Sequence, residues 1–204
     1  RILVELFKIL NLKNFFNLNE DKYLKEIFFL IFPEFNNLDR LDRLKKICNP
    51  SQVNKNILLA VLLIDDKDNH EYFAHKYNIA NNIKENLNLL AKNLKLSREH
   101  KDFFGKDLAK NIYLNNKNHL IDLNIINFAS NNKHKKKDFS DTLKKILQSK
   151  NNIFPIDGKH LMQKGMKEGL KLGRVLKMIE KEWIANGFKI SKNRVEEIIK
   201  LNSN

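Results

Sequence analysis

Residues 54–64, NKNILLAVLLI, decide the fold of this chain. From Ile57 to Ile64 every residue is apolar, so a helix over this stretch has little polar surface on any side. Such a helix must be buried all round, and we expect it to be the central core helix. Its apolar run is much shorter than the roughly 20 residues that a membrane span needs.

The sequence on both sides of this stretch repeats apolar residues at helical spacing. Residues 1–12 and 19–31 each predict an amphipathic helix, with Asn19 as the cap of the second and Pro33 after its end. The side chains expected to face the core are Ile2, Leu3, Leu6, Ile9 and Leu10 in the first helix, and Tyr23, Leu24, Ile27, Phe28 and Ile31 in the second.

Further helices are predicted over most of the remaining chain. Over 38–48 the leucines recur every third residue, and Asp39 and Arg43 form an outward i,i+4 pair. Ser97 is expected to cap a short helix. The other predicted helices cover residues 71–77, 81–94, 106–114, 118–128 and 139–147. No alternating β-branched run predicts a strand, and the fold class is all-α, a multi-helix bundle with a smaller C-terminal helical tail region.

The composition limits the class of protein. The chain has 204 residues, a net charge of +14 and nine Gly and Pro residues, too few for a β-sandwich. Its one cysteine, Cys48, excludes a disulfide framework and fits a reducing, cytoplasmic location. Residues 131–181 hold 14 basic and 5 acidic side chains, so they carry most of the excess charge. A local excess of this kind is typical of proteins that bind polyanions.

The clearest linker is NNKHKKK, residues 131–137. It has no apolar residue, and neighbouring lysines repel one another. We therefore predict a helical bundle over 1–130, a basic linker over 131–137 and a helical tail region over 138–204. The chain begins inside an amphipathic pattern without an initiator methionine, and we expect it to be a piece of a longer protein.

Catalytic and metal-binding patterns are weak in this sequence. Asp65, Asp66 and Asp68 offer oxygen ligands for a hard cation, but they follow a helix and are expected to form a solvated loop. The six histidines are scattered, and Cys48 has no histidine beside it. We therefore predict no catalytic residue, no metal ligand and no cofactor in this chain.

The most informative stretch covers residues 154–188, FPIDGKHLMQKGMKEGLKLGRVLKMIEKEWIANGF. Gly165, Gly169 and Gly173 are four residues apart and stand among basic side chains. This spacing predicts a helix that ends near Gly165, a turn, and a second helix that starts near Gly169. The glycines fit either close approach of a phosphate backbone or close packing of two helices.

This stretch resembles the C-terminal end of bacterial tRNA nucleotidyltransferases of the CCA-adding and poly(A) polymerase type. The residues that carry the resemblance are Phe154, Pro155, Gly158, Leu161, Gly165, Gly169, Leu172, Gly173, Leu176, Glu180, Trp183, Ile184, Gly187 and Phe188. Weaker similarity to the late neck and body of that family is carried by Arg1, Ile2, Glu5, Leu6, Pro33, Leu38, Arg40, Leu41 and Leu44. His160 stands where the family usually has Asp, and Leu170 where it often has Pro.

The resemblance implies late neck, body and tail without the catalytic head. In that family the head carries a Gly-Gly turn and a strand-borne Asp-x-Asp pair, and it uses magnesium with CTP or ATP. This chain has no Gly-Gly dipeptide, so the chain alone is expected to be inactive. The implied function is docking of tRNA or another structured RNA for 3′-end nucleotide addition by a head outside this chain. A separate head-bearing polypeptide is one partner that the resemblance implies.

Lysines are expected to contact RNA phosphates, so that shape is read rather than base identity. The predicted RNA-binding residues are Lys133, Lys135, Lys136 and Lys137 in the linker, and Lys159, Lys164, Lys167, Lys171, Arg174 and Lys177 around the tail turn. The alternative is a helical scaffold for protein interaction, in which the lysines only solvate the surface.

Overall fold

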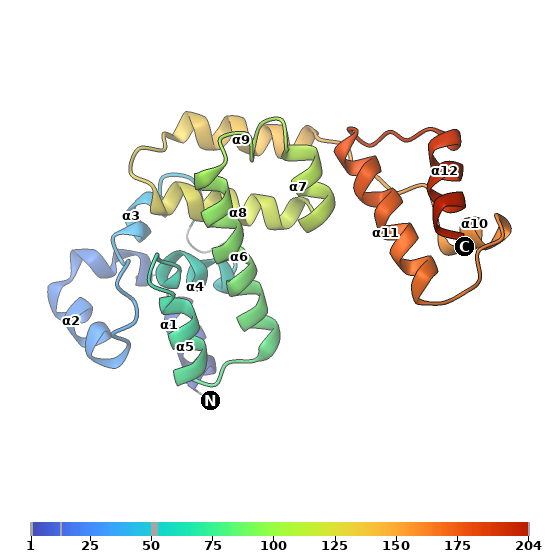
Figure 1. Cartoon of the computed structure of the whole chain (residues 1–204). Coiled ribbons are helices and arrows are strands. Elements are labelled where there is room, and N and C mark those ends of the chain that lie inside the picture. Colours follow the sequence, from blue (N-terminus) through green and yellow to red (C-terminus); the bar gives the residue numbers. More distant parts are fainter. Residues whose placement is uncertain (1, 13, 50–52, 204) are drawn as a thin grey trace. The chain divides into compact units, whose positions relative to one another are not determined.

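A computed structural model describes residues 2–12, 14–49 and 53–203, and Arg1 lies outside them. These residues form helices and connecting loops without a strand, which confirms the all-α class (Figure 1). Within the described ranges no helix has the length and apolar content needed to cross a membrane. The chain divides into two compact units, which we describe separately: a body unit, Arg1–Leu108 with Asn115–Ser149, and a tail unit, Ala109–Leu114 with Lys150–Asn204.

The body unit is a bundle around one buried helix. Its elements are α1 (Ile2–Leu10), the 3-10 helix η1 (Phe15–Glu20), α2 (Lys22–Ile31), α3 (Arg40–Leu44), α4 (Lys55–Leu63), α5 (Asn69–Lys76), α6 (Asn81–Glu99), α8 (Lys117–Ser130) and α9 (Lys136–Gln148). In α4 every residue from Ile57 to Leu63 is buried, as the sequence predicts. Helices α1, α5, α6 and α8 contact it, so α4 is the centre of this unit.

Two side chains fix the ends of α4. The Asn54 side chain accepts a hydrogen bond from the Asn56 amide at 2.8 Å and caps the N-terminus. At the other end, the Arg40 guanidinium donates to the carbonyls of Val61 and Ile64 at 2.8 and 2.7 Å. Burial lowers the pKa of Arg40 from its ordinary value, and the guanidinium satisfies carbonyls that the helix leaves without partners.

Helix α2 faces the core with a different side from the predicted one. Phe28 is its buried residue, and Tyr23, Leu24, Ile27 and Ile31, which were predicted to face inward, are all more than half exposed. The reason is an aromatic cluster: the Phe28 ring lies 5.5 Å from Phe15, 5.5 Å from Phe32 and 5.3 Å from Phe35, measured between centroids. Edge and tilted ring contacts of this kind favour the phenylalanine side of the helix.

The predicted helix caps in the first half of the chain also differ. Asp21 caps α2, because its carboxylate accepts from the Leu24 amide at 3.0 Å. The Asn19 side chain instead donates to the Leu38 carbonyl at 2.7 Å. Ser97 caps nothing: it lies inside α6, and its hydroxyl donates to the Leu94 carbonyl. In α1, Leu6 and Leu10 are buried as predicted, but Ile2 is half exposed.

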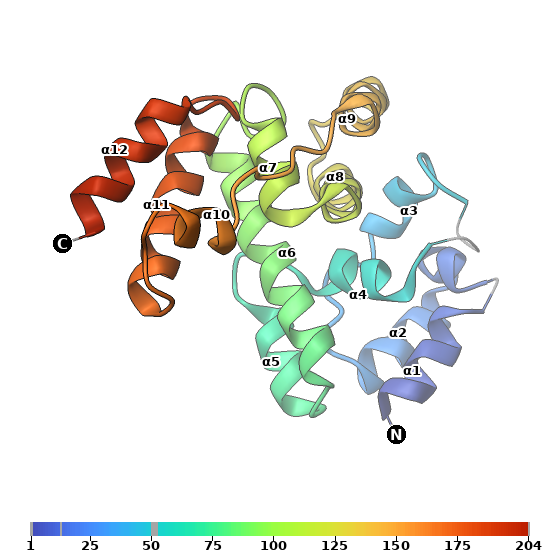
Figure 2. The ribbon, with the colours of Figure 1, turned by 90° about the vertical axis from the view of Figure 1, so that its right-hand side faces the viewer.

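The boundary between the two units differs from the predicted linker at 131–137. Helices α8 and α9 lie side by side in the body unit, and Phe139 and Ile146 of α9 are buried there (Figure 2). Residues 131–135 only connect these two helices, and Lys136 and Lys137 belong to the first turn of α9. The apolar face of α9 therefore moves the boundary to the connector after Ser149.

The tail unit combines residues 109–114 of α7 (Leu108–Asn115) with α10 (Gly158–Gln163), α11 (Leu170–Ala185) and α12 (Lys192–Ser203). The last three helices share one apolar core, which consists of Leu161, Met166, Val175, Ile179, Val195, Ile198 and Ile199. The predicted helix, turn and helix around Gly165 and Gly169 are confirmed, because α10 ends at Gln163 and α11 begins at Leu170. Leu170 stands at the first position of α11, where proline is favoured in helices generally.

Candidate nucleic-acid interface

The predicted RNA-binding residues lie in two groups, one on each unit. We call residues 131–137, with Lys133, Lys135, Lys136 and Lys137, the basic turn of the body unit. The second group, the tail basic surface, consists of Lys159, Lys164, Lys167, Lys171, Arg174 and Lys177. All ten side chains are exposed.

The backbone of the basic turn is fixed by an arginine from far away in the sequence. The Arg43 guanidinium donates to the carbonyls of Phe128, Asn131 and His134, at 2.9, 2.7 and 2.8 Å. Its Cζ atom lies 4.6 Å from the centroid of the Phe128 ring, a cation–π contact. The sequence had predicted an outward pair of Arg43 with Asp39. In the structure Arg43 instead satisfies carbonyls at the C-terminal end of α8 and in the turn that follows.

Two carboxamide and carboxylate side chains complete this turn. The Asn131 side chain accepts from the Lys133 amide at 3.0 Å, and the Asp138 carboxylate accepts from the Lys135 amide at 3.0 Å. After the turn, the buried ring of Phe139 packs against the ring of Phe128, with 5.5 Å between the centroids. The lysines therefore project from a backbone that is held on several sides.

The charges of the basic turn are not neutralised within the chain. Throughout the described residues, none of its four ammonium groups lies within ion-pair distance of a carboxylate. Lys136 and Lys137 also occupy the first turn of α9, where the helix dipole disfavours positive charge. This arrangement costs stability in the free protein, and an anion bound over the turn would relieve it.

A hollow of about 760 Å³ adjoins the basic turn in the body unit. Its lining includes the basic residues Arg40, Lys67, Arg98 and Lys133, and also Asp65 and Asp66. Arg98 donates to the Asp66 carboxylate at 3.3 Å and to the Ser130 hydroxyl at 2.8 Å. Lys67 and Arg98 were not among the predicted contacts, because only the fold brings them beside residues 130–133.

The aspartates of the loop at 65–68 form hydrogen bonds and an ion pair within the protein. The Asp65 carboxylate accepts from the amides of Lys67 and Asn69, at 2.9 and 3.2 Å. Asp66 pairs with Arg98, and Asp68 adopts a left-handed conformation before α5. In the described part of the chain no group of three or more His, Cys, Asp or Glu side chains is placed to hold a metal ion. Cys48 is half-buried, and burial raises its pKa to about 11.

In the tail unit the glycines fall into two kinds. Gly165 and Gly169 have φ angles of +92° and +143°, which L-residues rarely adopt, so the turn between α10 and α11 requires them. Gly173 lies inside α11. Apart from its chain neighbours and the backbone of α11 itself, no heavy atom of the described residues lies within 4 Å of the place where its Cβ would be. Close packing against another helix of the described part of the chain therefore does not explain Gly173.

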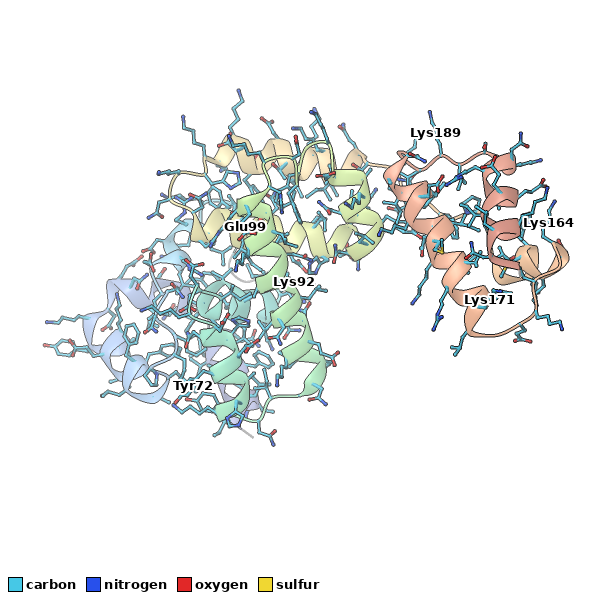
Figure 3. The ribbon with its side chains drawn as sticks, viewed as in Figure 1. Tyr72, Lys92, Glu99, Lys164, Lys171 and Lys189 are labelled. Carbon is cyan, nitrogen blue, oxygen red and sulfur yellow. The ribbon has the colours of Figure 1, made fainter. Side chains whose placement is uncertain are left out.

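The cations of the tail basic surface differ in whether an acidic side chain of the protein already pairs with them. Lys164, which is labelled in Figure 3, forms an ion pair with Glu196 of α12 at 2.6 Å, and its ammonium lowers the pKa of that carboxyl. Lys159, Lys167, Arg174 and Lys177 have no carboxylate within ion-pair distance among the described residues. Lys181, one turn beyond Lys177 on α11, is exposed as well, and its i,i+4 spacing could have identified it from the sequence.

An aromatic cluster fixes the far end of α11. The Trp183 ring lies 5.4 Å from Tyr113, 5.3 Å from Phe154 and 4.9 Å from Phe188, between centroids. The Tyr113 hydroxyl also donates to Glu180. Gly187, with φ at +65°, ends the helix in a Schellman motif, in which the Phe188 amide donates to the Trp183 carbonyl at 2.8 Å.

No protein-family model matches the chain, and no curated protein or solved structure matches it either.

Proposed function

We propose that this chain is an RNA-docking module, similar to the late neck, body and tail of a bacterial tRNA nucleotidyltransferase of the CCA-adding or poly(A) polymerase type. It holds tRNA, or another RNA of that shape, while a catalytic head outside this chain extends the 3′ end. One observation carries the proposal. The basic turn presents four exposed lysines, with no carboxylate of the described residues in ion-pair distance, on a backbone that Arg43 holds fixed.

The charge pattern favours a phosphate-rich partner. A rigid turn lowers the entropy lost when lysines bind, because the backbone is ordered before the ligand arrives. Lysine ammonium groups bind phosphates as point charges and read no base sequence, which suits recognition of a folded RNA by its backbone. The exposed cations of α11, Arg174 and Lys177, offer the same chemistry on the tail unit.

Binding of labelled tRNA at increasing salt concentration tests the proposal. Six or more phosphate contacts would lower affinity roughly 10³-fold or more between about 50 and about 200 mM salt, because bound counterions are released. Fluorescence anisotropy measures this change directly. An affinity that does not change with salt would contradict phosphate docking.

A pair of triple variants tests the tail contribution at equal net charge. The variant Lys167→Gln, Arg174→Gln and Lys177→Gln removes three cations of the tail basic surface. The control, Lys189→Gln, Lys192→Gln and Lys200→Gln, removes three other exposed lysines of the same unit. The first should weaken binding about 10-fold or more and the second much less. Equal losses would mean that only the overall charge matters.

A further inference from the structure

We propose that two copies of this chain associate through the outer face of α2, in an antiparallel helix pair. The face consists of Tyr23, Leu24, Ile27, Leu30 and Ile31, which we call the α2 stripe. All five are more than half exposed, and Tyr23 and Leu30 reach 78% and 83%. The proposal does not depend on RNA binding.

The α2 stripe is continuous. With about 100° between successive residues of a helix, the other four side chains lie within about 60° of Ile27. Phe28, about 100° round the helix from Ile27, lies beside the stripe and packs into the body unit. The apolar surface of α2 is therefore wider than the part that the described residues of the chain cover.

The area of the stripe is at the upper end of what monomers usually expose. Five large apolar side chains at these exposures present on the order of 600 Å². Two stripes in contact would bury at most on the order of 1,200 Å², and neighbouring residues would add to it. Specific interfaces begin at about this area. No charged residue lies within the stripe, since Lys22, Lys25 and Glu26 stand outside it.

The order of side chains in the stripe favours an identical partner. Leu24 and Leu30 stand three residues on either side of Ile27, and Tyr23 and Ile31 stand four residues on either side. In a twofold antiparallel pair centred on Ile27, leucine meets leucine, Tyr23 meets Ile31 of the second copy, and Ile27 meets itself. A twofold interface requires this self-complementary pattern. Antiparallel helices also bring opposite ends of their dipoles together.

Sedimentation velocity on the ribonuclease-treated chain, over a concentration series, tests the proposal. We expect a dimer that dissociates at about 1–100 µM. Leu30→Asp should raise the dissociation constant at least about 10-fold. The side chain is already exposed in one copy, so the helix content measured by circular dichroism should stay unchanged. The control Leu201→Asp, at a residue 79% exposed on α12, should leave the dimer intact.

Cysteine cross-linking in a Cys48→Ser background tests the register. Ile27→Cys should form a disulfide-linked dimer under mild oxidation, and Leu24→Cys mixed with Leu30→Cys should form the mixed dimer. Lys22→Cys, on the same helix but outside the stripe, should not. A chain that stays monomeric at every concentration, a dimer unaffected by Leu30→Asp, or equal cross-linking of Lys22→Cys would overturn the proposal. Binding of a different protein to the α2 stripe, without self-association of this chain, would overturn it as well.

Discussion

The Arg43 guanidinium lies over the ring of Phe128, with Cζ 4.6 Å from the ring centroid, while its Nε atom donates to the carbonyl of the same residue at 2.9 Å. The two residues are 85 positions apart in the chain. One side chain of α3 thereby anchors the end of α8 and the basic turn that follows it. The position of the four lysines thus depends on an arginine outside their own segment.

Arg43→Lys should destabilise the protein by about 2–4 kcal/mol, nearly as much as Arg43→Ala. A lysine carries a single ammonium group, which cannot reach the carbonyls of Phe128, Asn131 and His134 together. Urea unfolding measures the change. Arg98→Lys, at an arginine whose partner Asp66 is 93% exposed, serves as the control and should cost less than about 1 kcal/mol. Equal effects of the two substitutions would contradict the anchoring role of Arg43.

Substitutions of the tail glycines should separate stability from binding. Gly173→Ala should stabilise the protein by about 0.5–1 kcal/mol, because its backbone is helical and the space around it is open. Gly165→Ala, at a φ of +92°, should destabilise it by about 1 kcal/mol or more. If RNA backbone approaches α11 at Gly173, the first variant binds tRNA more weakly although it is more stable. Thermal unfolding and anisotropy together give both values, and unchanged binding would place the RNA elsewhere.

Asp122→Asn should stabilise the protein at neutral pH but not in acid. Burial raises the pKa of Asp122 to about 6, so the folded protein holds this proton more tightly than the unfolded chain does. The ionised form therefore lowers stability above the folded pKa, and the penalty vanishes below the unfolded value of about 4. The gain from asparagine should be about 1–3 kcal/mol at pH 8 and near zero at pH 4. Urea unfolding of both proteins between these pH values measures it, and a gain independent of pH would refute the assignment.

Nucleotide addition should require a second polypeptide. Incubated with tRNA, CTP, ATP and magnesium, this chain alone should incorporate no labelled nucleotide, because the Gly-Gly turn and strand-borne carboxylates of the catalytic head are absent from its sequence. A polypeptide that bears that head should restore incorporation when it is added. Incorporation by the purified chain alone would contradict the proposal that catalysis belongs to a separate head.

The sequence predicted most of the helices, because apolar spacing and Pro33 act locally, but not the continuation of α6 through Ser97. It could not predict which side of α2 faces the core. Phe28 on one side and Ile27 on the other are equally apolar, and only the rings of Phe15 and Phe35 decide between them. The boundary of the units was missed for a similar reason, because the burial of α9 outweighs the repulsion among its first lysines.

For the candidate site, the composition predicted that the lysines are exposed, but not which of them form ion pairs within the protein. Lys164 pairs with Glu196, which lies 32 residues away on another helix, whereas Lys167 has no such partner among the described residues. Spacing in the sequence cannot reveal a long-range ion pair of this kind. The left-handed conformations of Gly165 and Gly169, in contrast, follow from the need for a turn between two predicted helices.

The proposed RNA docking is tested most directly by the tRNA affinity of two triple variants with the same net charge. Lys135→Gln, Lys136→Gln and Lys137→Gln alter the basic turn, and Lys22→Gln, Lys84→Gln and Lys101→Gln alter exposed lysines elsewhere in the body unit. We predict that the basic-turn variant loses about 10-fold or more in tRNA affinity at about 150 mM salt. The slope of its log affinity against log salt should fall by the equivalent of about two to three phosphate contacts. The control should keep the affinity and the slope of the unaltered protein. Equal affinity and equal salt dependence of the two variants would contradict the account.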